Sequence, residues 1–148
     1  MDVGQSGEVN AGQTDGATAA PDVSPSLRTL AMPADTNPSG DIFGGWIMAQ
    51  MDLAGGTYAS HLARGRVATV AITGMQFLRP VYVGDEISCY CRTVRLGNTS
   101  ITVEIETWAR RREPGQAIKV TEGNFTFVAL DANGRPRPVL RADDATDS

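Results

Sequence analysis

The 148-residue chain has one histidine, two cysteines and few aromatic residues, which make up 6% of it. A structural zinc site needs several clustered ligands, and a single histidine far from both cysteines does not supply them. Cys89 and Cys91 stand two positions apart in one strand-like run, where a disulfide would be strained. We therefore expect two small, buried free thiols in a reducing compartment, which predicts a cytoplasmic protein.

The sequence also lacks an excess of positive charge and any long apolar run. It carries 13 basic and 17 acidic residues, a formal net charge of −4. Nucleic-acid binding needs a clustered basic surface, and a membrane span needs about 20 consecutive apolar residues. We expect neither nucleic acid nor membrane as a partner. A small phosphorylated ligand remains possible, because two or three well-placed arginines or lysines suffice for it.

The length suits one domain, and the 41% of hydrophobic residues can form a core. Residues 1–26 are rich in small and polar residues, which predicts a disordered N-terminal tail. Residues 27–138 contain the periodic apolar segments and form the predicted domain. Residues 139–148 are expected to be a polar C-terminal tail.

The apolar patterns predict one strand, one long helix and then four strands. Alternation is clearest where Ile101, Val103 and Ile105 share one face of a strand. The predicted strands span residues 27–32, 66–77, 86–96, 99–112 and 117–130, and the helix about 46–62. This order indicates an α+β fold, with one long helix against an antiparallel sheet of about five strands. One helix cannot cover both faces and the edges of such a sheet, so we infer an oligomer.

The predicted helix carries an acid on its apolar face. At 100° per residue, one face collects Met48, Met51, Gly55, Ala59 and Leu62. Asp52 lies among these residues, where a carboxylate is costly unless it is paired or used. Asp52 is thus either a hydrogen-bonded buried acid or a functional one.

Glycines mark two places in the same region. Gly44-Gly45 ends a polar loop at the helix start, where free backbone amides and the helix dipole can polarise a carbonyl oxygen. A plain glycine-rich turn is the other interpretation. Gly55-Gly56 costs roughly 1 kcal/mol per residue relative to alanine, which indicates that another backbone passes close by.

The chain contains no Gly-x-Ser-x-Gly elbow and no phosphate-binding loop. A Ser-His-Asp triad would need His61, the only histidine. His61 is nine positions after Asp52, about half a turn round the helix, so the two cannot cooperate within one chain.

Three segments carry a family resemblance: LRTLAMPADTNPSGDIFGGWIMAQMD, GRVATVAITGMQFLRPVYVGDEI and LGNTSITVEIETW. Together they resemble the YciA-type acyl-CoA thioesterases of the hot-dog fold superfamily, over about residues 27–138. The resemblance implies a long helix wrapped by the sheet, and dimers that commonly form hexamers. It implies hydrolysis of acyl-CoA to a carboxylic acid and coenzyme A without metal or organic cofactor. It also assigns Asp52 as the catalytic acid and places Asn37 and Gly44-Gly45 against the thioester carbonyl.

On this hypothesis Asp52 acts as general base or as nucleophile, and the sequence does not separate the two. The Gly45 and Trp46 amides and the Asn37 side chain would stabilise the oxyanion, and Asp41 is a possible supporting acid. The phosphates of coenzyme A need a local basic patch. The candidate residues are Arg79, Arg95, Asn98, Ser100 and Lys119, with the run Arg110 to Arg112.

The helix rise predicts a site shared between two chains. Asp52 lies seven or eight residues beyond Gly44-Gly45, about 10–12 Å along one helix. Base and oxyanion donors must both reach one thioester group, so we expect a dimer with composite sites. The family resemblance implies that such dimers assemble as a trimer of dimers. Two alternatives stay open: a dehydratase or hydratase, which would want a histidine beside the acid, and a non-catalytic acyl-CoA-binding module.

Overall fold

The computed structural model describes residues 19–112 and 115–140. Every predicted helix and strand is present there, with ends that differ from the prediction by at most two residues. The elements are β1 (Leu27–Leu30), the short 3-10 helix η1 (Pro33–Asp35), α1 (Gly44–Ala63), β2 (Val67–Phe77), β3 (Glu86–Leu96), β4 (Ser100–Arg110) and β5 (Ile118–Ala129).

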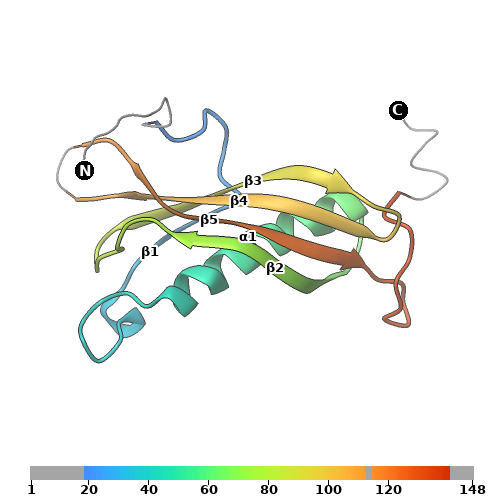
Figure 1. Ribbon diagram of the computed structural model, residues 1–148, viewed down its shortest axis with the longest axis horizontal. Coiled ribbons are helices and arrows are strands. Elements are labelled where there is room, and N and C mark those ends of the chain that lie inside the picture. Colours follow the sequence, from blue (N-terminus) through green and yellow to red (C-terminus); the bar gives the residue numbers. More distant parts are fainter. Residues whose placement is uncertain (1–18, 113–114, 141–148) are drawn as a thin grey trace.

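All five strands form one antiparallel sheet in the order β1-β3-β4-β5-β2. Helix α1 runs along one face of this sheet, as Figure 1 shows. The predicted α+β architecture is therefore confirmed. Strands β1 and β2 form the two edges, and exposed apolar side chains gather on β2, including Val70, Ile72 and Phe77. Within the described residues, no helix is both long enough and apolar enough to cross a membrane.

The core lies between α1 and the sheet. Ile101, Val103 and Ile105 are fully buried, as the alternation predicts, and Phe125 and Phe127 on β5 pack beside them. Burying one such side chain stabilises the fold by about 1.5–3 kcal/mol. The helix packs against these bulky side chains.

The buried face of α1 differs in part from the prediction. Its buried residues are Ile47, Met51, Ala54, Gly55, Ala59 and Ala63. Met51, Gly55 and Ala59 were placed correctly. Met48 is only partly buried and Leu62 is 37% exposed, so the prediction was wrong for Leu62. The helix lies so close to the sheet that mainly small side chains fit beneath it.

Gly55 shows how close this approach is. A Cβ atom at Gly55 would lie 2.7 Å from Ile105 Cδ1 and 2.8 Å from Phe127 Cζ. Real Cβ contacts are essentially never so short, so packing against the sheet requires glycine here. The expectation of a neighbouring backbone was wrong for Gly55, because side chains of the chain's own sheet fill that space.

The first turn of α1 lacks a side-chain cap, whereas its last turn is capped. The helix begins at Gly44, two residues earlier than predicted, and no side chain caps its first turn. At the other end Arg64 adopts a left-handed conformation with φ 55°, and Arg137 Nη2 donates to the Ala63 carbonyl at 2.7 Å. Val139, one residue past the predicted end of the domain, is fully buried.

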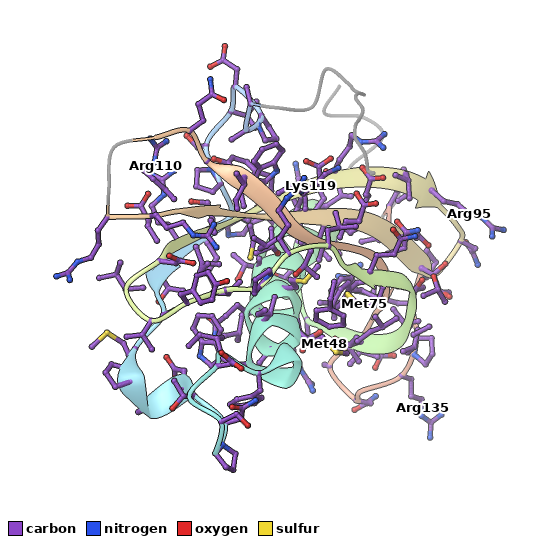
Figure 2. All side chains as sticks on the ribbon, turned by 60° about the vertical axis from the view of Figure 1, so that its left-hand side comes forward. Met48, Met75, Arg95, Arg110, Lys119 and Arg135 are labelled. Atoms are coloured by element: carbon purple, nitrogen blue, oxygen red, sulfur yellow. The ribbon has the colours of Figure 1, made fainter. Side chains whose placement is uncertain are left out.

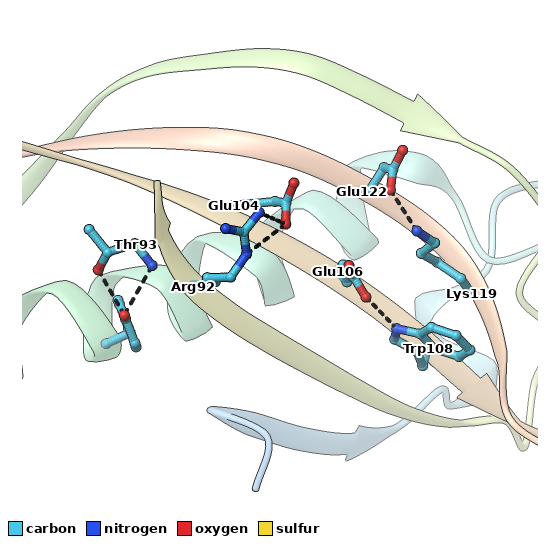
Figure 3. Close-up of polar contacts among 8 residues, drawn as sticks. Arg92, Thr93, Glu104, Glu106, Trp108, Lys119 and Glu122 are labelled. Carbon is cyan, nitrogen blue, oxygen red and sulfur yellow. Dashed lines mark hydrogen bonds and ion pairs between the residues drawn. The ribbon is translucent and has the colours of Figure 1, made fainter. Parts of the chain in front are cut away.

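Polar side chains cover the sheet face turned away from the helix. Arg92 Nη2 pairs with Glu104 at 2.8 Å, Trp108 Nε1 donates to Glu106 at 3.0 Å, and Lys119 pairs with Glu122 at 2.9 Å (Figure 3). These contacts pair polar groups along this face of the sheet, and they include the buried Trp108.

Part of the predicted N-terminal tail also lies over this polar face (Figure 1). Pro21 and Val23 line a groove there with Tyr90 and Arg92. The rest of the predicted tails, residues 1–18 and 141–148, lies outside the described residues.

Candidate active site

Asp52 lies in the middle of α1, beside the buried stripe rather than within it. Its side chain is partly exposed in the single chain, so the expected burial among Met48, Met51 and Ala59 is not seen. The Thr69 hydroxyl on β2 donates to Asp52 Oδ1 at 2.6 Å. This bond fixes the orientation of the carboxylate and leaves Oδ2 as an acceptor for a substrate or a water molecule.

Asp52 opens into a groove between α1 and the β2–β5 side of the sheet. The Asp52 groove has a volume of about 390 Å³, within the usual range of small-molecule sites. Its lining residues are Asp52, Leu53, Gly56, Thr57, Ser60, Arg66, Val67, Thr69 and Phe127. The groove thus combines one acid with hydroxyl groups and apolar side chains.

The start of α1 offers backbone donors. Its N-cap residue, Phe43, makes no side-chain cap. The Trp46 amide already donates to the Phe43 carbonyl at 3.1 Å, so the expected oxyanion role of the Trp46 amide does not fit the geometry. The Gly44 and Gly45 amides precede it in the first turn, where helix amides have no partner within the helix. These two amides are the donors open to a ligand.

Asn37 shapes the loop before the helix. Its Oδ1 accepts hydrogen bonds from the Ser39 amide at 2.9 Å and the Asp41 amide at 3.1 Å. Its side-chain nitrogen makes no hydrogen bond to another described residue, so it can donate to a substrate. Asp41 is exposed and holds the loop through its backbone, which supports a structural role for this residue.

A second cavity opens beside the helix start. Residues lining this helix-start pocket are Ile42, Gly44, Ile47, Phe77, Leu78, Arg79, Pro80 and Val81. Arg79 Nη1 donates to the Lys119 carbonyl at 3.1 Å, which anchors the guanidinium at the rim. The structure therefore brings Arg79 and the Gly44 backbone together in one cavity, although they lie far apart in sequence.

The helix-start pocket and the Asp52 groove share no lining residue. Gly44 and Asp52 are eight residues apart on one straight helix, which separates them by about 12 Å. A single chain therefore presents the acid and the oxyanion donors in different places.

The other candidate residues for coenzyme A divide between the two ends of the sheet. Arg95, Asn98 and Ser100 belong to the β3–β4 hairpin, and Figure 2 shows Arg95 far from Arg110. Lys119 lies near Arg79, but its ammonium group pairs with Glu122. Burial lowers the pKa of Lys119, but the hydrogen bond to Glu122 and the negative charges of Glu106, Glu122 and Glu104 together raise it above its usual value.

Arg111 has an internal role that the sequence did not indicate. Its Nη2 donates to the Pro80 carbonyl at 3.0 Å, and its guanidinium stacks over the Tyr82 ring at 5.0 Å. Its Nε lies 3.6 Å from an oxygen of the buried Asp85. Arg111 therefore braces the segment that forms the rim of the helix-start pocket and is not free to bind phosphate.

The histidine and the cysteines lie outside both cavities. His61 is exposed in the last turn of α1, beside Tyr58 and Leu62 rather than Asp52. Both cysteines are free, as predicted. Burial raises the pKa of the Cys89 thiol to about 11 and also raises the pKa of Cys91, so neither is a thiolate nucleophile near neutral pH.

Thr69 is the site residue that sequence reasoning missed. Threonine is common in strands, and no local pattern distinguishes Thr69 from Thr73 on the same strand. Only the packing of β2 against α1 brings the Thr69 hydroxyl to Asp52, seventeen positions away in sequence.

Comparison with known proteins places these residues in a family. The model of the Thioesterase superfamily matches residues 39–115. The acyl-CoA thioester hydrolase YciA of Salmonella typhimurium is 57% identical over 116 residues, which cover 76% of this chain and 87% of that protein.

Two solved structures show the same fold. A hexameric thioesterase from Yersinia pestis is 52% identical with a TM-score of 0.76, covering 80% of this chain and 97% of that chain. A hexameric hot-dog fold thioesterase of Campylobacter jejuni is 44% identical with a TM-score of 0.75, covering 78% of this chain and 90% of that chain. The long helix against a five-stranded sheet is thus a hot-dog fold.

Proposed function

The chain belongs to the thioesterase superfamily, with YciA acyl-CoA thioester hydrolases among its relatives, and from this premise we propose that it is an acyl-CoA thioester hydrolase. It cleaves the thioester of acyl-CoA into a carboxylic acid and coenzyme A. The observation that carries the proposal is the Asp52 carboxylate, held by Thr69 at 2.6 Å in a groove of ligand size. The reaction needs no metal or organic cofactor, because Asp52 and backbone amides supply both a base and an oxyanion site.

Two routes use the same residues. As general base, Asp52 takes a proton from a water molecule that attacks the carbonyl carbon; the C–S bond then breaks, and the proton passes to the departing sulfur of coenzyme A. As nucleophile, the carboxylate attacks that carbon itself, the C–S bond breaks with coenzyme A leaving as a thiolate, and water then opens the resulting anhydride to regenerate Asp52 and release the carboxylic acid. In both routes the carbonyl oxygen gains negative charge, which the Gly44 and Gly45 amides and the Asn37 side-chain amide stabilise. Thr69 acts as a positioning residue for Asp52.

The active site forms between two chains. Two α1 helices packed antiparallel about a two-fold axis bring the helix start of one chain to Asp52 of the other. The separation of about 12 Å within one chain supports this arrangement. So do the exposed apolar side chains of edge strand β2, which a second sheet would cover. The hexameric relatives favour a trimer of such dimers.

Pairing the chains also unites the candidate residues for coenzyme A. Arg79 lies at the helix-start end of its chain. Arg95, Asn98 and Ser100 lie at the other end of the sheet, in the β3–β4 hairpin, where Ser100 pairs with Val128. The two-fold axis therefore brings Arg79 of one chain toward the hairpin of its partner. Lys119 contributes its backbone carbonyl to Arg79, and its ammonium group stays paired with Glu122.

The alternatives fit the site less well. A dehydratase or hydratase would need a histidine beside the acid, and His61 lies in a different cavity. A pure binding module has no use for a partly exposed carboxylate oriented by a threonine. The curated relatives are named as hydrolases, which favours the same conclusion.

The test of the function is release of free thiol from acyl-CoAs of graded chain length, followed with a thiol reagent. Hydrolysis of at least one chain length, with a kcat in the usual enzymatic range above about 1 s⁻¹, is the expected result. Tight binding of acyl-CoA without any thiol release would instead assign the chain to the binding modules.

Arg79 is expected to hold the nucleotide end of coenzyme A. Arg79→Ala should raise KM for acyl-CoA by about 10-fold, because a hydrogen bond to a charged phosphate contributes about 1.5–3 kcal/mol. KM for the matching acyl-pantetheine, which lacks the nucleotide, should change by less than about 2-fold. Arg135→Ala, an exposed arginine outside both cavities, is the control. An equal rise of KM for both substrates would remove Arg79 from this role.

A further inference from the structure

Gly55 and Gly56 are adjacent in α1, but only one of them is required by the fold. A Cβ atom at Gly55 would collide with Ile105 and Phe127. At Gly56 the nearest atom would be Phe127 Cε1 at 3.9 Å, an ordinary van der Waals distance. Glycine destabilises the interior of a helix relative to alanine. The single chain therefore offers no packing reason for glycine at position 56.

Gly56 lies one helical turn beyond Asp52 and lines the same groove. The missing side chain leaves open the space next to the carboxylate. Leu53, Val67 and Phe127 also line this stretch, and Leu53 is 59% exposed in the single chain. An acyl chain that leaves the thioester carbonyl at Asp52 in this direction meets these apolar side chains and the empty position at Gly56 before it reaches the polar residues Ser60 and Arg66.

The partner's helix does not account for the glycine. In the antiparallel pair proposed above, the partner's helix start faces Asp52, so residues 44–52 of the two helices overlap. Gly56 lies four residues past that overlap, about 6 Å along the helix axis. The space over Gly56 is therefore beyond the end of the facing helix.

We propose that Gly56 is a specificity-determining residue, which keeps the Asp52 groove open for the acyl chain of the substrate. This inference rests on the proposed thioesterase function. It predicts that the size of the side chain at position 56 sets the longest acyl chain that the enzyme accepts.

The test is a size series at this position: Gly56→Ala and Gly56→Leu, both good helix formers. Relative to acetyl-CoA, Gly56→Leu should lower kcat/KM for the longest acyl-CoA that the wild type hydrolyses by at least about 10-fold, the usual effect of steric exclusion from an apolar pocket. Gly56→Ala should shift the profile in the same direction by less. His61→Leu places the same side chain on the exposed side of the helix and should leave the profile unchanged.

A second readout separates this inference from the proposed function. S-alkyl thioethers of coenzyme A cannot be hydrolysed, and their binding is measured by titration calorimetry. Gly56→Leu should weaken binding of the long thioether and spare that of the methyl thioether, even if the wild type hydrolyses nothing. The role of Gly56 would be overturned if Gly56→Leu weakened binding of all chain lengths equally, or if it left binding of every chain length unchanged. A change in the molecular mass of Gly56→Leu in solution would also overturn it, because the substitution would then act on the assembly.

Discussion

Replacing Asp52 by asparagine should lower kcat by at least about 100-fold, the usual scale for loss of an acid–base group. The change removes the proton acceptor and the nucleophilic oxygen but keeps the volume of the side chain. In the wild type the Thr69 hydroxyl donates to Asp52 Oδ1 at 2.6 Å. The side-chain carbonyl of asparagine can accept the same hydrogen bond. We therefore expect a folded variant in which KM changes much less than kcat, because the lost interaction acts in the chemical step.

Glu104→Gln is the matched control for this experiment. It makes the same acid-to-amide change on the polar face of the sheet, where Glu104 pairs with Arg92. Activity should stay within about 2-fold of wild type, because surface ion pairs contribute little to stability. Thiol release at the wild-type rate in Asp52→Asn would exclude Asp52 from both chemical routes.

The sequence predicted the fold well where one physical signal dominates. Alternation over Ile101, Val103 and Ile105 identified the inner face of β4, because period-two burial has few other causes. Hydrophobicity identified the helix face less well. Ala54 and Ala63 are buried whereas Leu53 and Leu62 are exposed, because the close approach of helix and sheet selects for small side chains rather than for apolar ones.

The site was predictable in its parts but not in its assembly. An acid on a helix face and glycines at a helix start can be recognised in the linear sequence, and they made Asp52 and Gly44-Gly45 candidates. The bond from Thr69 to Asp52 depends on how β2 packs against α1. The bond from the Trp46 amide to the Phe43 carbonyl, which counts against the predicted oxyanion role, depends on where the helix begins. Such contacts are set by tertiary structure, which a linear pattern does not encode.

The second large effect concerns the two-chain site. Asp52→Asn lacks the base, and Asn37→Ala combined with Gly45→Pro lacks the oxyanion donors, so each protein alone should be inactive. After unfolding and co-refolding in equal amounts, about half of the dimers contain one chain of each kind. In a composite arrangement each mixed dimer has one intact site of two. About a quarter of the wild-type activity should then return.

The most direct test of the shared site adds a second mixture, of wild type with one chain that carries all three substitutions. If base and oxyanion donors come from different chains, mixed dimers have no intact site, and about a quarter of the activity of an all-wild-type sample remains. If each chain holds a complete site, about half remains in this mixture and none returns in the first. The predicted result is about a quarter of the wild-type activity in both mixtures. The two-chain active site would be contradicted if about half of the activity remained in the second mixture and none returned in the first. This conclusion requires that the parent proteins are folded and that their subunits are shown to exchange.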